Sequence, residues 1–192
     1  DGIRDLVRSR GLGDVYKRQA LGNLGLIYLD RLDWSEAMRC FSKSLNIAHK
    51  IGDKSNQAIQ VGNVATVHYY RAEYKKSIEF NLKKLEIAKE IGDKGRVVFA
   101  LINLGVTYSD MGEFKLAERN LKKALNLSEQ MKEKRGESIA SGYLGITYSD
   151  MGEFKNAEKL FDRAIMISEE LNLLFTLTEI LIQKYMLLFK TG

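Results

Sequence analysis

The chain has 192 residues, 45% of them hydrophobic and 29% charged, which predicts a folded protein and excludes a disordered acidic or basic segment. Its net charge of +5 includes +2 from residues 1–19, and the remaining +3 is spread over many positions, so composition does not indicate a nucleic-acid surface. There is no proline, no apolar run of membrane-spanning length and only one cysteine, which together favour a nearly all-helical chain without an internal disulfide.

The first tract, residues 1–19, does not fit the pattern of the rest of the chain. It begins at Asp1, and the first methionine is Met38. It resembles a translated linker-like tract that stands in front of unrelated reading frames in environmental sequence assemblies. We therefore predict a non-native or linker-derived tail at residues 1–19, with a genuine basic arm as the alternative.

A motif then recurs at intervals of forty residues, at 23–28, 63–68, 103–108 and 143–148. A fixed period of this size predicts stacked units that cannot bury their apolar faces alone. We expect units at about 20–57, 58–97, 98–137 and 138–173, followed by the first helix of a fifth at 174–190. Each unit reads as two amphipathic helices, for example 97–110 and 114–131.

The turns between these helices carry recognisable signals at most positions. Gly112 is free to take a left-handed conformation, and the pairs Gly52-Asp53 and Gly92-Asp93 read as the end of one helix and the cap of the next. Asp33 and Glu36 form a potential capping box. The linker at 132–136 lacks such signals, and we expect a looser connection there.

Small residues occupy two columns of the repeat where paired helices can approach closely. The first helix of each unit contributes Gly25, Ala65, Gly105 and Gly145, and the second contributes Ala37, Ser77, Ala117 and Ala157. A large column beside them reads Tyr28, His68, Tyr108 and Tyr148. The second unit departs from the pattern at Asn81 and Lys84, which are either tolerated packing changes or a weak point in the stack.

This order of small, aromatic and apolar positions resembles the tetratricopeptide repeat, and the resemblance covers residues 20–192. The forty-residue spacing is similar to that of kinesin light chains and of many bacterial signalling proteins. The resemblance implies an all-α fold, a right-handed superhelical solenoid of antiparallel helix pairs. It also implies that the first helix of each unit lines a concave groove in which peptides or helices bind.

Mapped onto this chain, the groove columns are Asn23, Asn63, Asn103 and Tyr143, and beside them Leu26, Thr66, Val106 and Ile146. A carboxamide offers both a donor and an acceptor, which suits it to grip the backbone of an extended peptide. The alternative is that these asparagines hydrogen-bond the neighbouring repeat. Asp110 and Asp150, near helix C-termini where acids are disfavoured, either help to start the next helix or give the groove an acidic rim.

Other reactive side chains have simpler explanations than catalysis. His68 stands in the tyrosine column and is expected to be packed with one hydrogen bond, while Cys40 is expected to be a partly buried, inert thiol. No phosphate loop, nucleophile elbow or metal motif occurs. We therefore expect no enzyme activity, no cofactor and no metal.

The function that these features favour is a cytoplasmic scaffold that binds a protein or peptide ligand, and neither nucleic acid nor membrane. The alternative is a regulatory or sensor module of a larger bacterial signalling protein with a kinase, cyclase or transcription-regulator domain. The last residue, Gly192, falls in register with Gly112 and Gly152. We therefore expect more sequence to follow it in the natural protein, and self-association through an exposed terminal helix.

Overall fold

The computed structural model describes the backbone of residues 2–191 and the side chains of residues 12–189. Within this range the chain is all-α, with nine helices and no strand. They are α1 (Gly2–Asp30), α2 (Trp34–Lys50), α3 (Lys54–Tyr70), α4 (Tyr74–Glu90), α5 (Lys94–Asp110), α6 (Phe114–Met131), α7 (Lys134–Asp150), α8 (Phe154–Glu170) and α9 (Leu174–Thr191). The all-α fold class expected from the sequence is confirmed.

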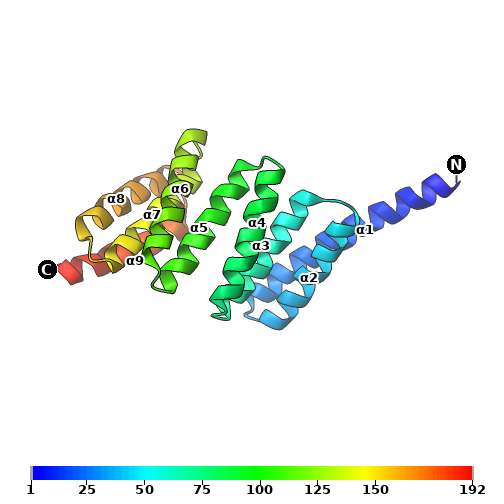
Figure 1. Ribbon diagram of the computed structural model, residues 1–192, viewed down its shortest axis with the longest axis horizontal. Coiled ribbons are helices and arrows are strands. Elements are labelled where there is room, and N and C mark those ends of the chain that lie inside the picture. Colours follow the sequence, from blue (N-terminus) through cyan, green and yellow to red (C-terminus); the bar gives the residue numbers. More distant parts are fainter. Residues whose placement is uncertain (1, 192) are drawn as a thin grey trace. The chain divides into compact units, whose positions relative to one another are not determined.

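The helices form two compact units, Asp1–Asp93 and Lys94–Gly192. In each unit consecutive helices pack side by side, as Figure 1 shows for α1 to α4 and for α5 to α9. We call α1, α3, α5 and α7 the A helices, and α2, α4, α6 and α8 the B helices that follow them. The last helix, α9, packs on α8 and α7 in the position of an A helix.

Paired helices meet where the A helix has no side chain. A Cβ atom added at Gly25 would lie 2.4 Å from the ring of Phe41, and one added at Gly105 would lie 2.4 Å from Cγ of Leu121. Gly145 stands in the same relation to Phe161, at 2.8 Å. Real Cβ atoms do not approach this closely, so each buried B-helix side chain packs directly on the backbone of its A helix.

In the second repeat, formed by α3 and α4, a different pair of residues meets at the contact between the A helix and the B helix. In the forty-residue register, Ala65 stands where the other A helices have glycine, and Asn81 stands where the B helices have Phe41, Leu121 or Phe161. Asn81 is buried, and its Nδ2 donates to the carbonyl of Ser77 at 3.1 Å. The smaller partner leaves room for the extra methyl group, so we interpret Asn81 as a compensating change in packing.

Each turn between helices contains a residue with positive φ, and half of these residues are not glycine. Gly52, Gly92, Gly112 and Gly152 have φ values of 69–78°, while the others are Leu32, Ala72, Lys132 and Asn172 at 53–61°. A left-handed conformation costs a residue with a Cβ about 1–2 kcal/mol. The packing of the helices on either side must therefore supply that energy.

The expectation of a loose connection at 132–136 is wrong. Lys132 takes the left-handed conformation at φ 56°, and the carboxylate of Glu133 caps α7 by accepting from the backbone N–H groups of Arg135 (3.1 Å) and Gly136 (2.6 Å). Neither residue is a strong sequence signal for this geometry. The turn has the same form as the others because the two helices that it joins are packed in the same way.

The glycine contact gives a direct test of the packing. Gly105→Ala should lower the free energy of unfolding by about 1–3 kcal/mol, because the new methyl group overlaps the buried Leu121 side chain. Gly13→Ala is the matched control, since nothing lies within 4 Å of its added Cβ. That control should be neutral or stabilising by up to about 1 kcal/mol. Urea unfolding of both variants measures the difference, and equal midpoints would contradict the packing described here.

Candidate functional site

The first of the two compact units, which contains α1 to α4, has a cleft between the exposed faces of α1 and α3. It has a volume of about 340 Å³ and is lined from α1 by Arg18, Gln19, Gly22, Asn23 and Leu26, and from α3 by Asn56, Ile59, Gln60 and Asn63. Gly22 allows the two helices to approach, because a Cβ there would lie 3.1 Å from Nε2 of Gln60. Five carboxamide side chains thus converge on one opening.

The carboxamides of the two predicted asparagines are not used to join the two repeats. Nδ2 of Asn63 donates to Oε1 of Gln60 on the same helix at 3.3 Å, which leaves its Oδ1 available as an acceptor. Asn23 is exposed, and among the described residues nothing hydrogen-bonds its side chain. Asn56 is committed to the start of α3, where its Nδ2 donates to Asp53 at 2.6 Å.

Two apolar side chains accompany these amides at the mouth of the cleft. Leu26 is 46% exposed and Ile59 is 36% exposed, so both offer apolar surface to a ligand. Thr66, the other predicted groove residue of this unit, donates its hydroxyl to the carbonyl of Gly62 one turn earlier. The cleft therefore combines the free carboxamide of Asn23 and the free Oδ1 of Asn63 with a smaller area of apolar surface.

Arg18 is a cleft residue that sequence analysis missed, because it lies within the tract at 1–19. Its side chain is buried, its Nε has no hydrogen-bond partner, and that atom lies 3.8 Å from Oδ2 of Asp53. Its backbone carbonyl accepts from the Ser44 hydroxyl at 2.9 Å. The forty-residue register contained a signal, since its equivalents Ala58, Val98 and Ser138 are small or apolar, and the structure buries all three. The boundary at residue 19 stays a prediction.

In the second compact unit, which contains α5 to α9, the surface that corresponds to this cleft is more apolar. Asn103 and Val106 on α5 and Tyr143 and Ile146 on α7 are all half-buried, and α5 packs against α7. Phe99 and the buried Ile102, also on α5, add further apolar side chains to this surface. Asn103 and Tyr143 both take part in interactions of their own. Asp110 and Asp150 are exposed at the C-terminal ends of α5 and α7, where they too are engaged.

Comparison with known families decides what kind of repeat this is. Models of the tetratricopeptide repeat match residues 20–55, 55–130 and 142–172, which together make up most of the chain. The chain belongs to the tetratricopeptide repeat family. A search of curated proteins finds no significant match to it.

Solved structures with the same fold include several bacterial and archaeal signalling proteins. Aspartyl phosphate phosphatase F from Bacillus subtilis has a TM-score of 0.82 and 19% identity, over 99% of this chain and 50% of that one. A signal transduction ATPase with a tetratricopeptide repeat sensor, from Pyrococcus horikoshii, has a TM-score of 0.76 and 20% identity, over 89% and 27%. A Rap protein complexed with competence and sporulation factor gives 0.73 and 20%, over 81% and 44%.

These likenesses show the fold alone, because the identities are low. The chain of this tetratricopeptide repeat protein spans about half the length of the phosphatase and about a quarter of the length of the ATPase. In the part of the chain that the structure describes, no helix is long and apolar enough to cross a membrane. The same part contains no group of three or more His, Cys, Asp or Glu side chains placed to hold a metal ion.

The side chains that could suggest catalysis are packed into the repeats. Nδ1 of His68 lies 2.8 Å from Oε2 of Glu73, and its ring stacks on Phe80 at 5.3 Å. Its expected packing, with one hydrogen bond, is confirmed. Cys40 is fully rather than partly buried, and burial raises the pKa of its thiol, which makes the thiolate nucleophile scarcer at neutral pH.

One residue of the tyrosine column, Tyr148, links its helix α7 to the preceding helix α6. The buried Tyr148 on α7 donates its hydroxyl to Oε1 of Glu118 on α6 at 2.8 Å. Nζ of Lys122 donates to the same oxygen at 2.6 Å and lies 5.7 Å from the centre of the tyrosine ring. The hydrogen bond from Lys122 and, to a smaller extent, the one from Tyr148 lower the pKa of the Glu118 carboxyl. An ionised acceptor strengthens both bonds.

Tyr148→Phe should therefore lower the free energy of unfolding at pH 7 by about 1.5–3 kcal/mol, the cost of one hydrogen bond to a charged group. The lowered pKa of Glu118 means that this contribution is complete above about pH 4.3, the usual value for glutamate, and disappears as pH falls through the folded-state pKa. Urea unfolding of the two proteins from pH 7 down to pH 3 measures it. A difference that stays constant over this range would contradict a bond to the carboxylate.

Proposed function

We propose that this protein is a non-catalytic module that binds an extended peptide segment of another protein. The observation that carries the proposal is the cleft between α1 and α3, where Asn23 and Asn63 present carboxamide groups that do not join the two repeats. A backbone has one N–H donor and one carbonyl acceptor per residue, and a carboxamide can meet either. Such a site grips an extended chain with little regard to its sequence.

Apolar contacts add selectivity to this grip. Leu26 and Ile59 stand beside the asparagines with much of their surface exposed, and they offer contact area for side chains on one face of the ligand. In an extended peptide alternate side chains point the same way, so every second residue of the ligand would meet this surface. We also propose that Asp110 and Asp150 attract basic residues of a ligand to the second unit, which would raise its association rate at low salt.

The similar fold of a Rap protein complexed with competence and sporulation factor supports a binding role for such repeats. The single buried cysteine suits a reducing compartment, which supports the cytoplasm as the place of action. A second candidate function is regulation within a larger signalling protein. It is favoured by the named phosphatase and sensor ATPase, which share this fold over only part of their lengths. The intact gene would distinguish the two functions.

Selection of peptides from a random library displayed on phage, with the whole chain as bait, provides ligands for a test. Asn23→Ala together with Asn63→Ala should weaken the binding of the selected peptides by about 1–3 kcal/mol, for two hydrogen bonds in a partly desolvated site. Isothermal titration measures the affinity. The urea midpoint should hardly change, because neither side chain bridges the two repeats.

The matched control is Asn46→Ala with Asn126→Ala, two exposed asparagines on B helices. This pair should leave affinity unchanged. Peptides that bind the cleft variant as tightly as the unchanged protein would overturn the proposed site. A large drop in stability with unchanged affinity would assign Asn23 and Asn63 to the fold instead.

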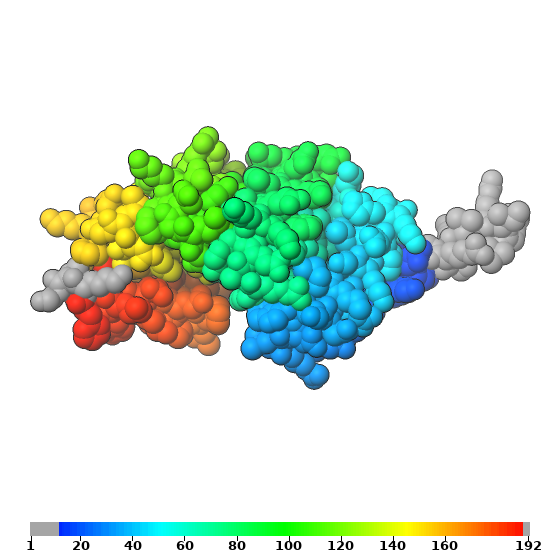
Figure 2. Space-filling model, turned by 60° about the horizontal axis from the view of Figure 1, so that its bottom comes forward, coloured from blue at the N-terminus to red at the C-terminus, as the bar shows by residue number. Residues whose placement is uncertain are grey.

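The outer surface of α9 supports a second proposal, self-association through the terminal helix. Phe175, Tyr185 and Phe189 are 76%, 62% and 88% exposed, and Figure 2 shows α9 in red at the surface. Tyr185 also occupies the column of Gly25, Gly105 and Gly145, so its ring obstructs a B helix from packing here as α8 packs on α7. Exposed apolar side chains that gather on one helix favour association.

We therefore expect light scattering to show a mass that rises above the monomer value as protein concentration increases. Phe175→Glu with Phe189→Glu should restore the monomer mass, because both charges would have to be buried on association. The double variant Leu12→Glu with Leu82→Glu, at exposed apolar positions on other helices, is the control and should still associate. A monomer at all concentrations for the unchanged chain would exclude this contact.

A further inference from the structure

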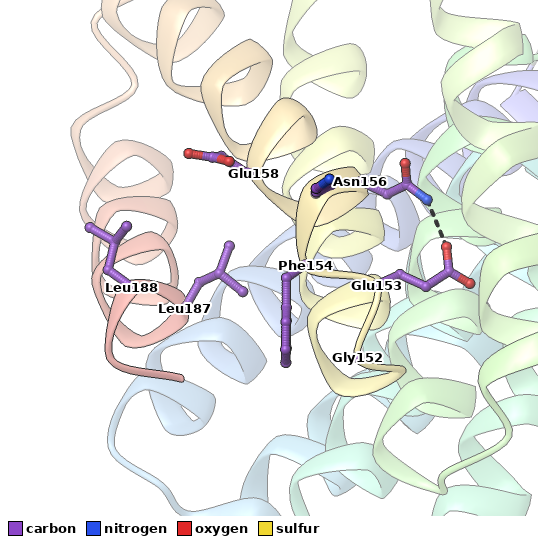
Figure 3. Close-up of a pocket in the computed structure, with 8 residues that line it drawn as sticks. Gly152, Glu153, Phe154, Asn156, Glu158, Leu187 and Leu188 are labelled. Carbon is purple, nitrogen blue, oxygen red and sulfur yellow. Dashed lines mark hydrogen bonds between the residues drawn. The ribbon is translucent and has the colours of Figure 1, made fainter. Parts of the chain in front are cut away.

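A pocket separate from the cleft lies where the start of α8 faces the end of α9. It has a volume of about 570 Å³, within the usual range for ligand sites. Figure 3 shows its principal walls, the ring of Phe154, the carboxylate of Glu158 and the side chains of Leu187 and Leu188. Glu153, Lys155 and Asn156 also line the pocket, so apolar walls stand beside polar groups, and Glu158 is the acid placed to accept a hydrogen bond next to the apolar part.

The preceding repeat shows what fits such a place. Forty residues earlier, Phe114 and Glu118 on α6 correspond to Phe154 and Glu158, and Tyr148 on α7 corresponds to Leu188. There the tyrosine ring is buried between the helices and its hydroxyl donates to Glu118 at 2.8 Å. The B helix therefore provides a binding site for a phenol ring, and the next helix in the chain provides the tyrosine that fills it.

The last repeat keeps the residues of this binding site, Phe154 and Glu158, but has no tyrosine to fill it. Leu188 has neither the ring nor the hydroxyl of tyrosine, and it is 49% exposed. Within the described part of the chain, no side chain hydrogen-bonds or ion-pairs with the Glu158 carboxylate. The lysine that shares Glu118 in the earlier repeat is replaced by Asp162, which pairs with Lys184. A carboxylate acceptor beside Phe154 and Leu188 thus lacks the partner that its equivalent has.

We propose that this pocket binds a tyrosine side chain of a partner polypeptide, with the phenol hydroxyl donating to Glu158. The ring packs against Phe154, Leu187 and Leu188, beside the position that corresponds to Tyr148 in the repeat before. The carboxylate gives tyrosine an advantage over phenylalanine, because a hydrogen bond to a charged acceptor is among the stronger ones. The proposal does not depend on the cleft between α1 and α3.

The test uses the whole chain, labelled with ¹⁵N, and two probes that differ only in the hydroxyl group, N-acetyl-tyrosine amide and N-acetyl-phenylalanine amide. The tyrosine probe should shift the amide resonances at the start of α8 and the end of α9, and it should bind about tenfold more tightly. N-acetyl-lysine amide is a third probe, for a site that simply attracts cations.

Three variants locate the interaction. Glu158→Gln leaves only a neutral acceptor for the phenol hydroxyl, and should remove most of the tenfold preference for the tyrosine probe over the phenylalanine probe. Glu153→Gln removes the same charge from the pocket rim, but that side chain is already bonded to Asn156 at 2.7 Å, so binding should not change. Leu188→Tyr supplies the phenol from the chain itself, and should abolish probe binding while it raises the unfolding midpoint by about 2–4 °C.

Equal affinity for the tyrosine and phenylalanine probes would overturn the proposal, as would tighter binding of the lysine probe. So would a tyrosine titration that moves no resonance near Phe154, Glu158 or Leu188. Circular dichroism of each variant shows that it is folded. Unchanged tyrosine binding in a folded Leu188→Tyr protein would place the probe elsewhere.

Discussion

The contact between the backbone of an A helix and a buried side chain of its B helix determines how each pair is built. Gly25, Gly105 and Gly145 allow Phe41, Leu121 and Phe161 to lie against the main chain at distances that no Cβ would permit. This contact fixes the spacing within a pair. It also uses one face of the A helix completely, which leaves another face of the same helix available to a ligand. The cleft between α1 and α3 lies on that available face.

Much of the fold was predictable because the period of the sequence is unusually regular. Helix positions and the glycines at 52, 92 and 112 follow directly from it. The turns at Leu32, Ala72 and Lys132 were not predictable, because their positive φ is imposed by helix packing and opposes the preference of the residue itself. Asn81 had no clear interpretation until its position opposite Ala65 was set beside the other three pairs.

The candidate site was predictable only in part. The repeat register placed Asn23, Leu26 and Asn63 on one surface, and the structure places all three at one cleft. It did not indicate Arg18, which lies in the excluded tract, or Gln60, which is almost completely buried. The proposed tyrosine-binding pocket at Glu158 could be recognised only once the contacts of Tyr148 were known. The sequence of the last repeat shows merely a leucine in a tyrosine column.

The central claim is that the carboxamides of Asn23 and Asn63 hold a peptide backbone. Side-chain amide resonances report on this most directly. Selective ¹⁵N labelling of asparagine makes the NH₂ groups of Asn23, Asn63, Asn46 and Asn126 visible in one spectrum. On addition of a selected peptide, the account predicts large shifts for Asn23 and Asn63 and none for Asn46 and Asn126 on the B helices. Shifts confined to the B-helix asparagines, or equal shifts at all four, would contradict it.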